Sequence, residues 1–292
     1  MTTEKYKASP GALVLRRFAR NRLAVAGAAV LILLTLLAAA APLVSPFPYD
    51  ELHMGDLPDG NPLPPLSPKY ALGTDQFGRD YLTRCVFGGR MSLSVGFLSA
   101  LVSLAIGIPL GLAAGYFGGA ADIAVMRFTE FLSCIPSFFL ILIANSIFHA
   151  SIFNVMAIIG MFSWMGICRQ ARAQCLHLKE QDFVMSARAM GFSHFYIIRR
   201  YILPNALSPV IVSATLNVAY AIITESSLSY LGLGVQEPVP SWGAMLKAGQ
   251  DYMRVAPWMA VLPGLLILFV ALSLNFMGDG LRDALDPRAV RR

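Results

Sequence analysis

The chain has 292 residues, of which 56% are hydrophobic and only 14% are charged, with a formal net charge of +6. A mean hydropathy of +0.61 is too apolar for a soluble domain of this length, so the composition argues against a soluble protein and indicates a membrane protein. The basic excess is typical of the inner loops of membrane proteins, and we expect no nucleic-acid partner.

Five stretches without a charged residue follow one another along the chain. They cover residues 23–49, 91–121, 131–168, 201–224 and 255–278, and each exceeds the roughly 20 residues that a membrane-spanning helix needs. The third stretch is long enough for two helices, with a turn at residues 149–151. The first follows a long polar and basic segment, unlike the short leader of a cleaved signal peptide. We therefore expect an all-α membrane protein with six transmembrane helices.

The basic residues are distributed asymmetrically about these spans. Seventeen of the 23 Lys and Arg residues precede the first span, follow the last, or lie in loops on that same side, and six lie in two outer segments. Because basic residues concentrate in cytoplasmic loops, we expect both termini to be cytoplasmic. We divide the chain into a cytoplasmic segment, 1–22, and a transmembrane domain, 23–292, with an outer segment at 46–90, a cytoplasmic loop at 169–205 and an outer turn at 231–254.

The two outer regions differ in character. The first contains the proline-rich run PDGNPLPPLSPK, which favours an extended strap over regular helix or sheet. Thr74 or Asp75 is then placed to cap a short amphipathic helix on the outer membrane surface, and Gly88 and Gly89 are expected to end it. In the outer turn, Trp242 is expected at the depth of the lipid headgroups.

The cytoplasmic loop contains the compact basic stretch AMGFSHFYIIRRYILPN, residues 189–205. Asp182 is placed to cap a helix that ends at Gly191, where a positive φ angle suits glycine. Ser193 is placed to cap a second helix, and Pro204 is expected to limit it. Two short amphipathic helices at an angle favour one of two roles: docking into the groove of a partner, or packing back onto the spans of the same chain.

This loop resembles the cytoplasmic loop of ABC importer permeases. The family pattern is Glu-Ala-Ala, three residues, Gly, nine residues, Ile, one residue, Leu-Pro, and it falls here on Met185, Ser186, Ala187, Gly191, Tyr201, Leu203 and Pro204. The glycine and the Leu-Pro pair agree with the pattern, whereas the glutamate, the first alanine and the isoleucine are replaced. Three further stretches, LGTDQFGRDYLTR with GGRMSL, SLSYLGLGVQEPVPSWGAML and NFMGDGLRDALDPR, resemble the second permease subunit of dipeptide, oligopeptide and nickel importers.

The resemblance implies the type I ABC importer permease architecture in the bacterial cytoplasmic (inner) membrane. It implies a homologous second permease subunit, two ABC ATPase subunits, an extracytoplasmic peptide-binding protein and membrane lipid as partners. The chain has no G-x-x-x-x-G-K-[ST] motif, so we expect ATP and Mg in the partner subunits and no cofactor on this chain. The residues expected to couple the spans to the ATPase are Met185, Ser186, Ala187, Arg188, Met190, Gly191, Phe192, Phe195, Leu203 and Pro204.

Four polar residues within or directly beside the apolar stretches are candidates for the translocation path, because polar groups inside a membrane are costly unless they serve a function. Glu225 lies near the outer end of the fifth span, where it could meet the amino terminus of a peptide; a hydrogen bond to a neighbouring helix is the alternative. Asn217, Asn145 and Glu130 are weaker candidates, with interhelical hydrogen bonding as the alternative.

Two alternatives to a peptide permease are open from the sequence. Importers of nickel, glutathione or another small solute have similar permeases, although no His or Cys cluster along the spans suits a soft metal. A membrane-embedded enzyme would need a nucleophile, a base or a metal cluster near one membrane face. The four histidines are scattered over both sides and the four cysteines show no CxxC spacing, so we expect neither catalytic nor metal-binding residues.

Overall fold

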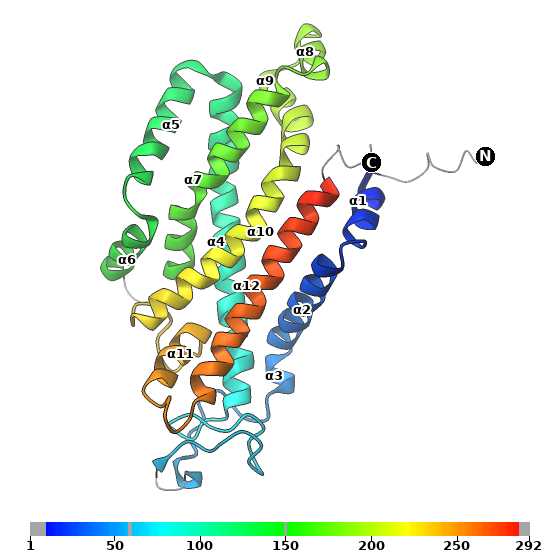
Figure 1. Ribbon diagram of the computed structural model, residues 1–292. Helices are drawn as coiled ribbons and strands as arrows, with labels where there is room; N and C mark the ends of the chain where they lie inside the picture. The colour runs from blue at the N-terminus through cyan, green and yellow to red at the C-terminus, as the bar shows by residue number, and fades with distance from the viewer. Residues whose placement is uncertain (1–9, 58–59, 149–150, 286–292) are drawn as a thin grey trace, which may run out of the picture.

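The computed structural model describes residues 10–57, 60–148 and 151–285, which form a helical bundle (Figure 1). In chain order the elements are α1 (Pro10–Phe18), α2 (Arg22–Ala39), α3 (Ala41–Val44), a 3-10 turn (Met54–Asp56), α4 (Tyr81–Phe117), α5 (Gly119–Ser133), α6 (Ser137–Ile147), α7 (Ile152–Leu178), α8 (Asp182–Ala189), α9 (His194–Ile197), a π-helical turn (Ile198–Ile202), α10 (Leu203–Tyr230), α11 (Trp242–Gln250) and α12 (Trp258–Leu285).

Within the described residues, five helices are long and apolar enough to cross a membrane: α2, α4, α7, α12 and the continuous helix His194–Tyr230 that contains α9 and α10. The remaining span is bent, because α5 and α6 meet at 82°. Pro136 lies at the break and cannot donate a backbone hydrogen bond to a continuing helix. This span begins earlier than expected, at Gly119. The prediction of an all-α membrane protein is confirmed, with six spans when the bent pair counts as one.

The bundle has two distinct ends (Figure 1). α8 and α9 lie at one end, together with α1 and the last turns of α12, whereas α11 and the segment between α3 and α4 lie at the other. Because α1 and the end of α12 share one end of the bundle, the arrangement agrees with an even number of crossings. The end that carries α8 and α9 is the one that the charge distribution assigns to the cytoplasm.

The most extensive helix packing in the bundle joins α4 and α7. Gly107, Gly111 and Gly115 recur every four residues along the face of α4 that meets α7. A Cβ atom on Gly111 would lie 2.3 Å from the backbone oxygen of Cys168, and one on Gly107 would lie 2.8 Å from the backbone oxygen of Trp164. Small residues at this spacing let membrane helices approach closely, and here they hold α4 against α7.

Replacing Gly111 with alanine is expected to destabilise the protein by about 1–3 kcal/mol, because the added methyl group must push two backbones apart. Thermal unfolding of the detergent-purified protein measures the effect. Gly264→Ala in α12 is the matched control, since a Cβ there would lie an ordinary 3.7 Å from Leu246 Cδ1. Equal unfolding midpoints for the two variants would contradict the close packing of α4 and α7.

The start of α4 corrects the expectation for the outer segment. Asp80 caps this helix by accepting a hydrogen bond from the backbone N–H of Thr83 at 2.8 Å. The helix then continues through Gly88 and Gly89 into the second span, so the prediction of a separate surface helix ended by these glycines was wrong. A Cβ atom on Gly89 would lie 2.8 Å from the ring of Trp242, so the glycines make room for this ring.

Trp242 therefore lies inside the protein, at the start of α11, and its ring packs against α4 and does not face lipid. Its side chain is only 2% exposed. The indole Nε1–H donates a hydrogen bond to the backbone oxygen of Cys85 at 2.9 Å, which satisfies its polar atom in the core. The outer turn is consequently packed against α4.

The outer segment is irregular over most of its described length, as its proline content predicts. A cluster of charges fixes its last part to the outer turn. Asp75 accepts a hydrogen bond from Arg79 Nε at 2.6 Å and its carboxylate lies 3.4 Å from Arg84 Nε. Glu237, in the loop after α10, accepts from Arg79 at 2.6 Å and from Arg84 at 3.0 Å. Asp75 and both arginines are nearly fully buried, so the ion pairs hold the two outer regions together.

Candidate functional site

The cytoplasmic loop forms the predicted helix pair, which protrudes from one end of the bundle (Figure 1). Gly191 follows α8 with a φ angle of +77°, as predicted. Ser193 caps α9 by accepting a hydrogen bond from the backbone N–H of Tyr196 at 3.3 Å, also as predicted. The start of α8 differs from the prediction: Gln181 occupies the N-cap position without a capping hydrogen bond from its side chain, and Asp182 lies in the first turn, where its charge favours the helix N-terminus.

One face of the helix pair packs onto the chain's own spans. The side chains on this face are fully buried, and they join residues of α4 and α7 in one hydrophobic cluster. The buried residues of the pair and the adjoining turn are Val184, Ala187, Ile197 and Ile202, and their neighbours in the cluster include Leu112, Tyr116 and Cys175. Ala187, which we expected at a partner contact, therefore packs internally, because it lies on the inner side of α8.

The opposite face of the pair is exposed and apolar. Met185 is 50% exposed, Met190 65%, Phe192 39% and Phe195 72%. We call these four residues the docking face. The structure thus shows one of the two roles, packing onto the chain's own spans, on the buried face, while exposed apolar side chains on the other face favour contact with a partner.

The polar residues of α8 flank this docking face. Ser186 is exposed. Arg188 is exposed too, and its guanidinium lies 4.9 Å from the centre of the Tyr116 ring, a cation–π contact with the end of α4. Tyr116 also shares a 3.0 Å hydrogen bond with His194 of α9. These contacts anchor both helices of the pair to α4.

Pro204 does not end the second helix, contrary to the prediction. α9 continues through the π-helical turn into α10, with Leu203 and Pro204 at the beginning of α10. The N–H of Leu203 donates to the carbonyl oxygen of Ile198, five residues back, so the wider turn accommodates the proline without a break. The second helix of the pair, α9, is thereby continuous with the fifth span.

A polar groove runs along α7 and α10 from the break between α5 and α6 toward the cytoplasmic end of α12. It consists of three adjoining cavities of about 330, 320 and 480 Å3. The first two share lining residues, as do the second and third. The polar residues of the groove are Ser133, Ser137, Ser163, Arg169, Gln170, Gln174, Ser208, Ser213, Asn217, Tyr220 and Arg282.

Asn217 is one of the four predicted path candidates, and it lies where the first two cavities meet. Its amide nitrogen is buried and has no hydrogen-bond partner among the described residues. Arg169 lines the first cavity and donates to Ser133 Oγ at 3.2 Å. In the sequence, Arg169 is only the first residue of the expected cytoplasmic loop, whereas in the structure it lines a cavity whose other wall is the break between α5 and α6.

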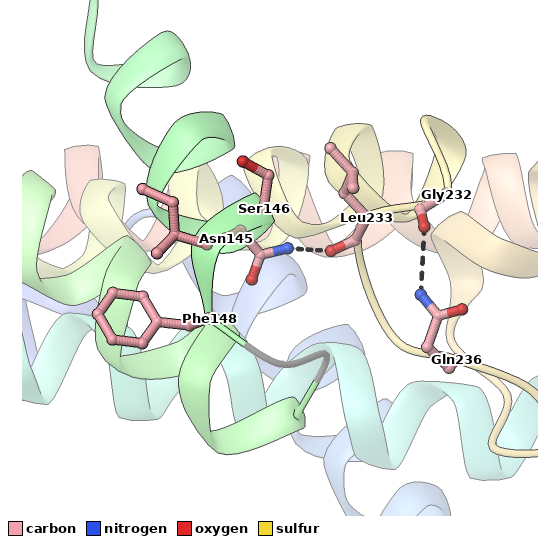
Figure 2. Close-up of a pocket in the computed structure, with 7 residues that line it drawn as sticks. Asn145, Ser146, Phe148, Gly232, Leu233 and Gln236 are labelled. Atoms are coloured by element: carbon pink, nitrogen blue, oxygen red, sulfur yellow. Dashed lines mark hydrogen bonds between the residues drawn. The ribbon is translucent and has the colours of Figure 1, made fainter.

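Asn145 lies outside this groove, near the end of α6 (Figure 2). Its amide nitrogen donates to the backbone oxygen of Leu233, and its amide oxygen has no partner in the described part of the chain. It lines a separate cavity of about 360 Å3 between α6 and the loop after α10, with Gln236 among the other lining residues. The hydrogen bond to Leu233 joins α6 to the loop after α10, and it therefore differs from the interhelical bond that was the alternative role for Asn145.

The two acidic candidates have different environments. Glu130 is exposed and pairs with Arg127 at 2.9 Å on the surface of α5. Glu225 is fully buried near the outer end of α10, where it accepts hydrogen bonds from Ser229 Oγ at 2.7 Å and Ser92 Oγ at 3.3 Å. Glu225 thus bonds to a neighbouring helix, as the alternative interpretation states.

Replacing Glu225 with leucine is expected to lower the free energy of unfolding by about 2 kcal/mol, since two hydrogen bonds to serine hydroxyls are lost inside the protein. Thermal unfolding in detergent is the measurement. Glu225→Gln keeps an acceptor oxygen and is expected to lose less than half as much stability. A leucine variant as stable as the parent chain would contradict this role.

No group of three or more His, Cys, Asp or Glu side chains within the described residues is placed to hold a metal ion. The bundle therefore offers two functional features: an exposed apolar helix pair joined to a span, and a polar groove between spans. Together with six candidate spans, they define a multi-pass membrane transport component.

The chain belongs to the family of binding-protein-dependent transport system inner membrane components, which matches residues 107–291. The N-terminal transmembrane domain of oligopeptide transport permease C matches residues 9–65. These matches confirm the resemblance on which the sequence analysis relied, and they identify the chain as an inner-membrane permease.

Named relatives are similar over nearly the whole chain. The oligopeptide transport system permease protein OppC of Haemophilus influenzae is 41% identical over 94% of this chain and 87% of its own. The dipeptide transport system permease protein DppC of Alkalihalophilus pseudofirmus is 38% identical over 96% and 90%. The glutathione transport system permease protein GsiD of Pectobacterium atrosepticum is 39% identical over 94% and 89%.

A solved structure supports the fold. Inward-facing MetNI, a methionine ABC transporter, contains a chain that is 21% identical, with a TM-score of 0.53 over 72% of this chain and 98% of that one. The expected type I ABC importer permease fold is thereby confirmed.

Proposed function

We propose that this chain is one permease subunit of an ATP-driven importer of dipeptides or oligopeptides. The observation that supports the proposal most is its 41% identity, over 94% of the chain, to an oligopeptide transport permease. Import of glutathione is a second candidate, because a glutathione permease is 39% identical over the same share of the chain. Both candidates are short peptides or peptide-like solutes, so they make similar demands on a polar path.

The docking face is proposed to contact a separate ATPase subunit. Met185, Met190, Phe192 and Phe195 present apolar side chains to solvent, which favours insertion into a groove of a partner protein. Since the π-helical turn joins α9 to α10 without a break, movement of the docked pair is transmitted to the fifth span. ATP and Mg are assigned to that partner, and no cofactor and no catalytic residue is assigned to this chain.

The polar groove is proposed to line this chain's half of the translocation path, with a homologous second permease lining the other half. A groove that carries serine, asparagine and glutamine side chains can exchange hydrogen bonds with peptide amides along the way. An extracytoplasmic peptide-binding protein is proposed to deliver the substrate to the end that carries α11.

Purification of this chain from its native membrane in mild detergent tests the assembly. The proposal expects a second six-span permease and one or two ATPases to accompany the chain, with measurable ATP hydrolysis. Phe195→Asp, which places a charge in the docking face, should release the ATPases while leaving the second permease bound. A chain that purifies alone under gentle conditions would contradict the proposal.

A further inference from the structure

The first cavity of the polar groove has an unusual charge balance. Among the residues that the structure describes, no acidic side chain lines any of the three cavities, whereas Arg169 lines the first and Arg282 lines the third. None of the ion pairs formed by the described residues includes Arg169. Within the described part of the chain, the groove therefore presents positive charge without a counterion.

Arg169 has most of its hydrogen-bonding capacity free for a ligand. A guanidinium group carries five N–H donors, and the structure assigns one hydrogen bond, from Nη1 to Ser133 Oγ at 3.2 Å. The planar fork of arginine matches a carboxylate in a two-bond geometry. Arg169 is exposed in this chain, so a carboxylate that enters the groove can reach its free donors and is attracted by its positive charge.

A second donor is available in the same cavity. The buried amide nitrogen of Asn217 has no partner among the described residues, and an unpaired buried donor costs free energy until a ligand satisfies it. Asn217 lies on α10 and Arg169 on α7, so the two donors approach the cavity from different helices. A peptide's terminal carboxylate and a neighbouring backbone carbonyl together supply the two acceptors that this arrangement lacks.

We propose that Arg169 and Asn217 form a subsite for the free C-terminal carboxylate of a peptide in transit, with Arg169 binding the carboxylate and Asn217 a backbone carbonyl. This inference depends on the proposed function and refines it, because it names the chemical group that the permease itself recognises. It predicts that this chain, independently of the peptide-binding protein, favours a free carboxylate over a neutral terminus.

The test compares uptake of one peptide with a free or an amidated C-terminus into proteoliposomes that contain the complete transporter, with the peptide-binding protein saturated by each. Arg169→Gln is expected to reduce the ratio of free-acid to amide uptake by about tenfold, since a charge-assisted two-bond contact is lost. Arg169→Lys, which keeps the charge but not the fork, should reduce the ratio less. Arg127→Gln, an exposed arginine paired with Glu130 outside the groove, is the control and should leave the ratio unchanged.

Two results overturn the subsite, and they are distinguishable. If the parent transporter imports neither peptide, the proposed function fails and the subsite fails with it. If the parent imports peptides but Arg169→Gln lowers both uptake rates equally, only the subsite fails, and the arginine instead serves packing or pairs with an acidic group of the second permease.

Chemical labelling gives an independent readout. Gly166 lies in the groove, and a Cβ atom there would meet nothing within 4 Å, so Gly166→Cys fits without strain. The exposed native thiol is first removed by Cys134→Ser. Unlabelled peptide with a free carboxylate should protect Cys at 166 from a thiol reagent better than its amide does, and Arg169→Gln should abolish the difference. Equal protection by both peptides in the parent chain would overturn the subsite.

Discussion

Replacing Gly191 with valine is expected to reduce the rate of substrate transport by about tenfold or more. The protein should still insert into the membrane. Gly191 has a φ angle of +77° and lies between α8 and α9, so it sets the angle of the helix pair. A β-branched residue is strained at such a φ angle, by about 1–3 kcal/mol, and relief of the strain would turn α8 relative to α9. Uptake and ATP hydrolysis, measured together in proteoliposomes, should show hydrolysis that no longer drives transport.

The control for this variant is Gly191→Asn, because asparagine tolerates a left-handed backbone conformation much better than valine does. A Cβ atom at this position would meet nothing within 4 Å, so side-chain crowding does not distinguish the two variants. Asparagine is therefore expected to retain most of the transport activity. Normal transport by the valine variant would remove Gly191 from the coupling mechanism.

Replacing Asp75 with asparagine is expected to lower the free energy of unfolding by about 3–5 kcal/mol. This loss is larger than those expected for Gly111→Ala and Glu225→Leu. The change removes a buried negative charge that lies 2.6 Å from Arg79 and 3.4 Å from Arg84, and it leaves both buried arginines to share the half-exposed Glu237. The outer turn should then separate from the start of α4. Thermal unfolding and protease sensitivity of the outer region are the measurements.

Glu130→Gln is the matched control for Asp75→Asn. It also removes one carboxylate from an ion pair with arginine, but Arg127 and Glu130 are 79% and 61% exposed. Exposed pairs contribute about 1 kcal/mol or less, so little change is expected. Equal losses of stability in the two variants would show that burial does not strengthen the contribution of the outer ion pairs to stability.

The cytoplasmic helix pair was predictable because short-range signals determine it. A glycine in a left-handed conformation and a serine cap act within a few residues of their own positions, and both Gly191 and Ser193 are found as predicted. Pro204 misled the prediction, since a proline usually ends a helix and only the π-helical turn before it permits continuation.

The long-range features were harder to predict. Gly88 and Gly89 were interpreted as a helix end, and their function of admitting the Trp242 ring depends on a residue far along the chain. The repeat of Gly107, Gly111 and Gly115 was readable from spacing alone and was missed, although it predicts close helix packing in membranes.

Of the two residues proposed to bind a peptide in the groove, one was predicted from the sequence and the other was missed. Asn217 was predicted as a path candidate because a polar amide within a span is costly, and the structure places it in the groove. Arg169 was missed because its sequence position resembles that of any arginine near an inner loop. Its proximity to Ser133 depends on the packing of α5 against α7, a contact between separate helices that spacing along the sequence does not indicate.

ATP-dependent uptake of a labelled peptide tests the central claim most directly. Proteoliposomes would contain this chain with the subunits that purify with it, and the peptide-binding protein would be supplied at the face that carries α11. The account predicts that the peptide accumulates only when ATP is present on the side of α8 and α9, and that Phe195→Asp abolishes accumulation. Accumulation that proceeds without ATP, or that survives a charge in the docking face, would contradict the account.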